Sequence, residues 1–382
     1  MTITENMAVL ARSAATVPTA ASDPAPGANL IINGGMTVSQ RGTSFAGLGA
    51  ADFYTLDRWY QQKGSGSETL RVTVSQESAG GVGTNKNWLK MLCTTADASL
   101  GATDAFRMHQ LIEGYVGRAL VTDSSADLAA SAVSMDIIAH ADGASSITFP
   151  AKVGLCLQTA DGTAREYVTD ITIAAADTWE RVTFAIPSDA TAFVNNSTGT
   201  GPSLIVTIAG GSSRQTASED AWTNTVGDYV SADSDNFCDA TNNYVGITDV
   251  KWEVGSTATA FQHEPYGDVL ARCHRYYEKL AFPTDGSVIA AATYSQSASS
   301  AQWGLMFSIK RATPTFVVSA AAGWNIYDGG AATLASISCG EASLISCRVN
   351  MGSSGSTWTA GNAGMLRNVS GQPSTIEIIS EL

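Results

Sequence analysis

Residues 250–277, VKWEVGSTATAFQHEPYGDVLARCHRYY, contain the end of a predicted strand and the start of a predicted helix. Apolar and polar side chains alternate around Trp252, which is the period-two pattern of a strand with one buried face. Pro265-Tyr266-Gly267 then marks a turn, because Pro fixes φ and Gly tolerates conformations that other residues avoid. Apolar side chains next recur at intervals of three and four, which predicts a short amphipathic helix over residues 268–280 with Asp268 as its N-cap.

The same alternation recurs upstream, in short runs separated by turn-forming residues. These runs are residues 70–74, 133–137, 153–157, 171–173, 182–186 and 204–208. Alternation places one face on a core and the other in water, which favours antiparallel sheets over a parallel α/β sheet. The indole rings at strand positions are expected to fill this core. They belong to Trp59, Trp88, Trp179 and Trp252.

Downstream of the helix the sequence returns to strand-like runs. They are residues 288–294, 303–309, 315–319, 337–339, 344–349 and 375–379. The predicted fold class is therefore all-β, with an antiparallel jelly-roll-like β-sandwich over residues 29–267. A short linking helix (268–280) and a second, smaller C-terminal β domain (281–382) follow. Residues 1–28 carry three prolines and are predicted to form an N-terminal anchor or linker, with a disordered tail as the alternative.

A set of short motifs stands in a definite order along the chain. They are Asn29 to Gly34, Gln40-Arg41-Gly42-Thr43, Leu56-Asp57-Arg58-Trp59, Gln110 to Gly114, Trp179 to Phe184, Trp252-Glu253, Gly255-Ser256, Ala258 to Phe261 and Cys273-His274-Arg275-Tyr276-Tyr277. Together they resemble the carbohydrate-binding-like β-sandwich of bacteriophage tail-fibre and other virion-attachment proteins. The resemblance implies that a host surface glycan is recognised by binding and not by chemistry. Long acidic and Ser-rich loops depart from the family pattern, so the identity of the ligand does not carry over.

Composition excludes several classes of partner. The net charge is −14 with no basic cluster, which argues against nucleic acid and against an anionic membrane surface. The apolar runs fall far short of the roughly 20 residues that a membrane span needs. The N-terminus has no basic leader, so we expect no secretory signal. A virion component made in the host cytoplasm and released by lysis would need none.

The sequence offers no recognisable catalytic constellation. It has no GxSxG, HExxH, P-loop or GxGxxG opening a helix, so we expect a protein that is not an enzyme and needs no cofactor. A glycan hydrolase would need two facing carboxylates, for which the candidates are Glu113, Asp136, Asp249 and Glu253. The four histidines are scattered and are interpreted as structural or surface residues.

The six cysteines lack metal-ligand spacing and are expected to be buried free thiols. Cys339 and Cys347 flank a predicted hairpin turn, which makes them the one pair to test for a disulfide. No metal site is predicted from the cysteines and histidines.

The acidic loop, residues 219–243, is the predicted functional site. Asp233, Asp235, Asn236 and Asp239 offer oxygen ligands suited to Ca²⁺, but the spacing lacks the central Gly and final Glu of an EF-hand, so a solvated loop is favoured. Aromatic side chains in the same loop offer flat faces for sugar rings, although buried loop anchors explain them equally well. The candidate glycan-binding residues are Trp222, Tyr229, Asp233, Asp235, Asn236 and Phe237.

These observations predict a phage fibre or spike protein for host attachment. We expect a homotrimer, because the fibre resemblance accompanies a lone apolar helix whose stripe could be buried against its own copies. The N-terminus is expected to contact other virion proteins. The alternative is a structural virion component, such as a head fibre, capsid decoration or baseplate adaptor, and a glycan hydrolase comes third.

Overall fold

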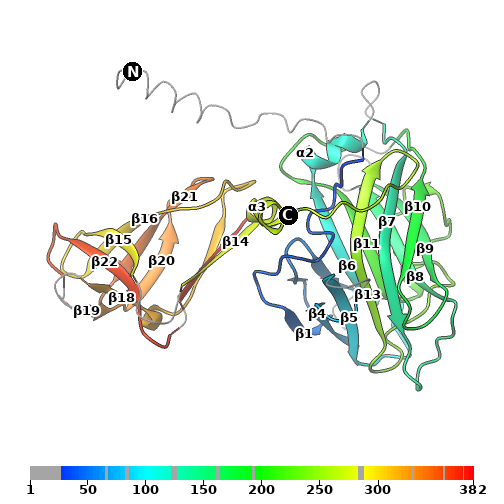
Figure 1. The fold of residues 1–382 in the computed structure, drawn as a ribbon, viewed down its shortest axis with the longest axis horizontal. Coiled ribbons are helices and arrows are strands. Elements are labelled where there is room, and N and C mark those ends of the chain that lie inside the picture. Colours follow the sequence, from blue (N-terminus) through cyan, green and yellow to red (C-terminus); the bar gives the residue numbers. More distant parts are fainter. Residues whose placement is uncertain are drawn as a thin grey trace.

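The computed structural model describes residues 27–64, 68–81, 86–121, 127–159, 164–191, 194–282, 288–327, 331–355, 358–372 and 374–382. The predicted N-terminal anchor therefore lies outside the described residues except at its last two positions. The described chain forms two β domains, with helix α3 (Tyr266–His274) and the C-terminus between them (Figure 1). The all-β prediction is confirmed. None of the helices in the described segments is long and apolar enough to cross a bilayer.

The first domain is a sandwich of two antiparallel sheets within the described residues. The first sheet has the order β1 (Ser44–Leu48), β4 (Arg71–Glu77), β5 (Trp88–Thr95), β13 (Tyr244–Val254), β7 (Ser131–His140), β10 (Glu180–Ile186). The second has the order β12 (Trp222–Thr223), β9 (Arg165–Ile173), β8 (Ala151–Thr159), β11 (Thr200–Gly210), β6 (Ala105–Glu113), β3 (Tyr60–Lys63), β2 (Phe53–Tyr54). Helix α2 (Gly114–Gly117) and the 3₁₀ turns η1 (Arg118–Leu120) and η2 (Ser212–Arg214) join strands. Strand β13 lies between β5 and β7, far from both in sequence, as jelly-roll-like connections require.

Side chains of alternating strand positions from both sheets fill one core. Trp59 and Trp252 are fully buried in it, as predicted. The Trp252 indole N–H donates to Ser131 Oγ at 3.0 Å, which satisfies its one polar atom. Residues 29–32 run beside β13, where Asn29 Oδ1 accepts from the backbone N–H of Trp252 at 3.1 Å.

The prediction that Trp88 and Trp179 fill the core is wrong. Both rings lie on the outer face of the first sheet, where they meet edge to face at 5.4 Å. Gly246 makes this arrangement possible, because a Cβ there would lie 2.5 Å from the Trp88 ring. The indole therefore packs flat against β13 from the solvent side.

The second domain contains a small and a large antiparallel sheet. The small sheet has the order β14 (Tyr277–Phe282), β23 (Ser374–Ile379), β17 (Thr315–Val318). The large sheet has the order β19 (Ala331–Thr333), β18 (Trp324–Tyr327), β22 (Ala363–Asn368), β15 (Val288–Ser295), β16 (Ser300–Met306), β21 (Ser346–Gly352), β20 (Ser336–Gly340). One 3₁₀ turn, η3 (Ala321–Gly323), precedes β18. Side chains of both sheets share a second core around Trp324 and Ile378.

The linking helix is shorter than predicted. It ends at His274, and the residues expected to form its last turn make strand β14. It begins after Pro265 at the N-cap position, so Asp268 lies in the first turn. Tyr277 pairs with Ile379 in the ladder with β23. Interstrand hydrogen bonds of the second domain thus outweigh the helical periodicity of this segment.

The C-terminal residues and α3 form a joint between the domains. Arg58, whose side chain is 2% exposed, pairs with Glu381 and stacks over the Tyr276 ring at 3.7 Å. Arg41 pairs with the same carboxylate at 3.1 Å. Glu113 accepts from Arg275 Nη2 at 2.6 Å. The last residues of the chain are therefore tied to the first domain by buried charge.

Trp252→Ala is expected to lower the free energy of unfolding by roughly 3–5 kcal/mol, because it removes a large ring from a close-packed core. Urea denaturation measures this change. Tyr294→Ala is the control, since that side chain is 55% exposed and should change stability by about 0.5 kcal/mol or less. An unchanged midpoint for Trp252→Ala would show that the ring is not in the core.

Glu381→Ala should cost about 3–5 kcal/mol, because it leaves the buried Arg58 without its acidic partner. The matched control is Glu341→Ala, which breaks a pair with Arg348 whose side chains are 65% and 40% exposed. That change should cost about 1 kcal/mol or less. Equal effects of the two variants on the thermal unfolding midpoint would contradict the role of the joint.

Candidate functional site

The acidic loop crosses the outer face of the second sheet. Two glycines of the sheet permit this contact. A Cβ at Gly154 would lie 2.3 Å from the Tyr229 carbonyl oxygen, and one at Gly210 would lie 2.8 Å from Val230. The loop therefore covers this sheet face closely.

The aromatic residues predicted to bind glycan in this loop serve largely as its anchors. Phe237 is fully buried in the sandwich core, so its ring is not available for stacking and that assignment is corrected. Tyr229 is 7% exposed, and the Arg107 guanidinium lies 3.9 Å from its ring centre. Trp222 is half-buried against Tyr167. Its indole N–H donates to a backbone carbonyl at 2.8 Å.

The predicted oxygen ligands of the loop hold the loop itself in place. Asp235 accepts from the Lys152 backbone N–H at 2.7 Å. Asn236 donates to the Asp97 carbonyl at 2.8 Å, and Asp233 lies 3.3 Å from the Lys152 ammonium. Across the described segments, no group of three or more His, Cys, Asp or Glu side chains is arranged to hold a metal ion.

A different group of rings lies on the outer face of the first sheet, on β5, β7, β13 and the residue that precedes β10. We call the group made by Trp88, Trp179, Tyr244 and His140 the aromatic patch. The His140 and Tyr244 rings stack at 5.2 Å with an interplanar angle of 12°. Trp179, Tyr244 and His140 are half-buried, whereas Trp88 is 6% exposed. The patch thus has a covered centre and accessible rings around it.

Charged groups border the aromatic patch. Asp177, 55% exposed, accepts from Tyr244 Oη at 3.0 Å and lies 2.9 Å from His140 Nδ1. The Lys90 ammonium lies 4.3 Å from the Tyr244 ring centre. Partial burial and the hydrogen bond to Asp177 raise the pKa of Tyr244 to about 12, so its hydroxyl remains a donor. The patch combines apolar ring faces with hydrogen-bonding groups.

The sequence contained a signal for this patch. In the alternating patterns of β5 and β13, Leu89 and Val245 point inward, so Trp88 and Tyr244 occupy positions on the solvent face. Aromatic side chains at solvent-facing strand positions are informative when they cluster. Clustering depends on strand order, which the pattern does not give.

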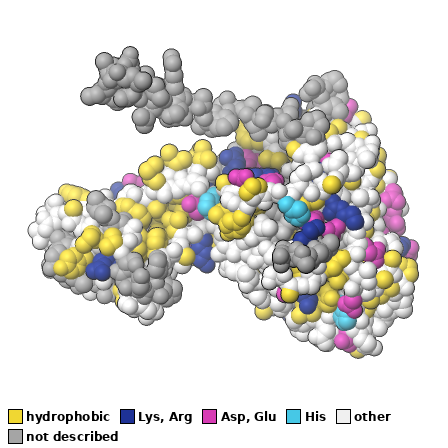
Figure 2. Space-filling model, viewed as in Figure 1, with side chains coloured by type: hydrophobic (Ala, Val, Ile, Leu, Met, Phe, Trp, Pro, Cys, Tyr) yellow, Lys and Arg dark blue, Asp and Glu magenta, His cyan; other side chains and the backbone are white. Residues whose placement is uncertain are grey.

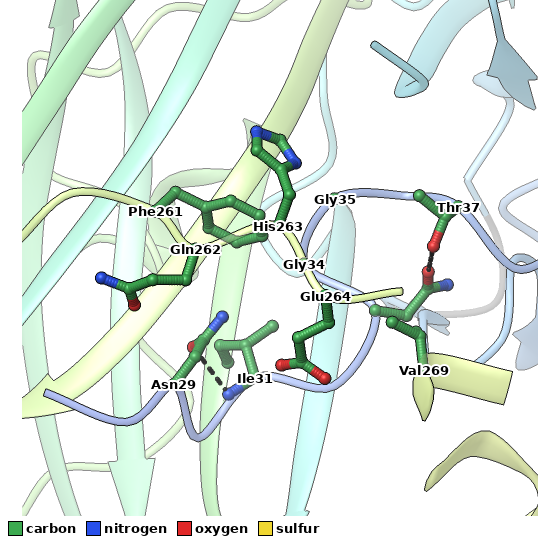
Figure 3. A pocket seen from close by; sticks show the side chains of 11 residues that line it. Asn29, Ile31, Gly34, Gly35, Thr37, Phe261, Gln262, His263, Glu264 and Val269 are labelled. Atoms are coloured by element: carbon green, nitrogen blue, oxygen red, sulfur yellow. Dashed lines mark hydrogen bonds between the residues drawn. The ribbon is translucent and has the colours of Figure 1, made fainter. Parts of the chain in front are cut away.

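A small pocket lies between residues 29–37 and the segment that follows β13 (Figure 3). Its volume is about 20 Å³, which is room for about one water molecule. The Phe261 ring lies 3.5 Å from where a Cβ of Gly35 would be, and Glu264 pairs with Arg272 at 2.6 Å. A monosaccharide does not fit in it.

The four carboxylates considered for hydrolysis all have cationic partners. Glu113 pairs with Arg275 and Glu253 with Lys251. Asp136 and Asp249 both contact Lys86, at 3.6 and 2.6 Å. These ion pairs account for the four residues structurally, and the expectation that the protein is not an enzyme stays a prediction.

All six cysteines are free, and five of them are buried, as expected for structural thiols. Cys339 and Cys347 lie on the paired strands β20 and β21. They are not joined in this structure.

No protein-family model and no curated protein matches the chain. Solved structures similar to it include TmCBM61 in complex with β-1,4-galactotriose, at 9% identity and TM-score 0.28, covering 60% of this chain and 99% of that one. The CBM22-1–CBM22-2 tandem domain of Paenibacillus barcinonensis Xyn10C has 10% identity and TM-score 0.28, covering 95% and 100%. The enzymatically active domain of bacteriophage CBA120 tailspike protein 4 has 8% identity and TM-score 0.29, covering 59% and 21%. Likenesses this low assign no function to the chain.

The variant Glu166→Gln tests whether the pKa of the Glu166 carboxyl, buried under the acidic loop, is raised. Burial, opposed by a hydrogen bond from the Gly227 N–H, raises the pKa of Glu166 from 4.5 to about 7. Because the folded state holds the proton more tightly, this residue's stabilising contribution is complete below pH 4.5 and is lost as the pH rises through about 7. The stability of the wild type relative to Glu166→Gln should therefore fall by about 3 kcal/mol over that range. Thermal denaturation at both ends of the range measures it, and a constant difference would contradict the raised pKa.

Proposed function

We propose that the first domain binds a glycan through the aromatic patch, without cleaving it. The observation that supports this is a set of half-buried rings on a solvent-facing sheet surface, bordered by Asp177 and Lys90. The apolar faces of sugar rings pack against aromatic side chains, while carboxylates and amines bond to sugar hydroxyls. We therefore prefer the aromatic patch to the acidic loop as the glycan-binding surface.

We further propose that the protein is a phage fibre or spike component that attaches the virion to its host. The order of the sequence motifs, from Asn33-Gly34 to Tyr276-Tyr277, supports this attachment role. The negative net charge is consistent with it, because it disfavours nucleic acid as the partner. The virion, after synthesis in the host cytoplasm, is the proposed location.

A structural virion component is the second candidate. The second domain carries exposed apolar side chains, visible as yellow groups across it (Figure 2). Met306 is 75% exposed, Val317 53% and Ile345 44%. Large exposed apolar side chains favour contacts with other proteins, and we assign the contacts with other virion proteins to this domain.

The homotrimer remains a proposal, but its support from the helix is withdrawn. The α3 stripe is covered within the chain, where Val269 and Cys273 pack with Ile32, Val38 and Tyr276. A trimer would instead use the exposed apolar side chains of the second domain. Light scattering at micromolar concentration should give three times the chain mass, and a stable monomer would exclude the trimer.

Glycan binding is tested with the double variant Trp179→Ala/Tyr244→Ala on an array of bacterial surface polysaccharides. Loss of two ring contacts should weaken binding to the recognised polysaccharide about tenfold or more. Trp222→Ala is the matched control, because this half-buried ring lies on the other sheet. The bound polysaccharide should be recovered uncut. If only Trp222→Ala weakened polysaccharide binding, the acidic loop would be the binding site. If the wild type bound no polysaccharide, the structural virion component would be favoured.

A further inference from the structure

A second cluster of functional side chains lies on the outer face of the second sheet, beneath Tyr229. Strand register places its members side by side. On β6 and β11, Arg107 is directly opposite Thr207 and His109 is opposite Ile205. Tyr60 on β3 is opposite His109. This face is remote from the aromatic patch, which lies on the other sheet.

Several polar atoms of this cluster are buried without a hydrogen-bond partner. Arg107 is 4% exposed, and its Nη2 donates to the Lys63 carbonyl at 3.0 Å. Its Nε and Nη1 have no partner, nor do His109 Nε2 and Thr207 Oγ1. Buried polar groups in folded proteins are nearly always paired. Arg107 Nε and Nη1 can only donate, so these two unpaired atoms indicate a missing acceptor.

The charges of the cluster identify the kind of acceptor. The guanidinium groups of Arg107 and Arg214 lie 3.9 and 5.7 Å from the Tyr229 ring centre. In the described part of the chain, neither has a carboxylate within ion-pair distance. Among the described residues, the two cations therefore share one ring without a carboxylate in direct contact. One of them is buried, and a buried charge normally has a partner.

The nearby carboxyls oppose this positive charge only weakly. Burial raises the pKa of Glu166 to about 7 and raises that of Asp228 as well. A share of Glu166 is therefore protonated near neutrality.

We propose that Arg107 and Arg214 form an anion-binding site for a carboxylate or sulfate group, of the kind that acidic sugars carry. The anion would accept hydrogen bonds from Arg107 Nε or Nη1 and lie between the two guanidinium groups. The Tyr229 ring lies against both guanidinium groups in the structure, so it has to turn aside when the anion enters. The site does not depend on glycan binding at the aromatic patch.

The full chain is titrated with sodium sulfate, sodium glucuronate and glucose, at ionic strength held constant with chloride, while its thermal unfolding midpoint is measured. Sulfate also stabilises proteins without binding, by exclusion from their surface. The diagnostic is therefore a saturable rise in the midpoint that Arg107→Gln abolishes. Arg348→Gln, at an exposed ion pair in the second domain, is the matched control and should keep the full rise.

Two further variants keep the test decisive if Arg107→Gln fails to fold. Arg214→Gln should weaken the saturable response severalfold, because it removes the more accessible cation. Tyr229→Ala should strengthen it severalfold, because it removes the ring that blocks the guanidinium. A response to glucuronate alone assigns a carboxylate, and a response to sulfate alone assigns a sulfate ester. The proposal is overturned if neither sulfate nor glucuronate gives a saturable rise in the midpoint of wild type and of Tyr229→Ala. It is also overturned if Arg107→Gln and Arg214→Gln respond like wild type.

Discussion

The buried guanidinium of Arg58 is the interaction on which the arrangement of the two domains depends. It is stacked on Tyr276, paired with Glu381 and bonded to the Leu111 carbonyl. A charge removed from water at this depth requires every one of these partners. Arg58 also has a positive φ of 72°, which L-residues rarely adopt. The contacts of the Arg58 side chain help to hold that conformation. The same contacts fix Glu381, near the C-terminus, and Tyr276, just after α3, relative to each other.

The joint explains what several of the ordered sequence motifs have in common. Gln40 donates to Asp57 and to the Tyr277 carbonyl, and Glu113 accepts from Tyr276 Oη at 2.8 Å. Motifs separated by hundreds of residues thus meet at one place, where they connect the sandwich to the next domain. The joint residues Gln40, Asp57, Glu113, Tyr276 and Tyr277 are architectural and belong neither to the aromatic patch nor to the Arg107 cluster, whereas Trp179, which opens another motif, lies in the patch. A resemblance carried by such motifs predicts the fold well and the ligand poorly.

The two outer sheet faces differ because of one loop. Gly154 and Gly210 allow the loop to lie on the second sheet, where it buries Arg107 and His109. No described segment covers Tyr244 on the first sheet in this way, so Tyr244, His140 and Trp179 remain half-buried. The same sandwich therefore presents an open surface of rings on one side and a covered, cationic one on the other. Ligands of different chemistry suit the two faces.

The sequence alone determined the strand pattern, because period-two alternation records directly which side chains face the core. Residues 204–208 and 375–379 were identified in this way, and the core position of Trp252 followed. Tertiary structure decided the rest. Tyr277 joined a strand because β23, a hundred residues later, supplied hydrogen bonds. Phe237 became a core residue, and Trp88 and Tyr244 became neighbours, through strand order. Local periodicity contains no information on which distant strands pair, and a binding surface is made of such pairs.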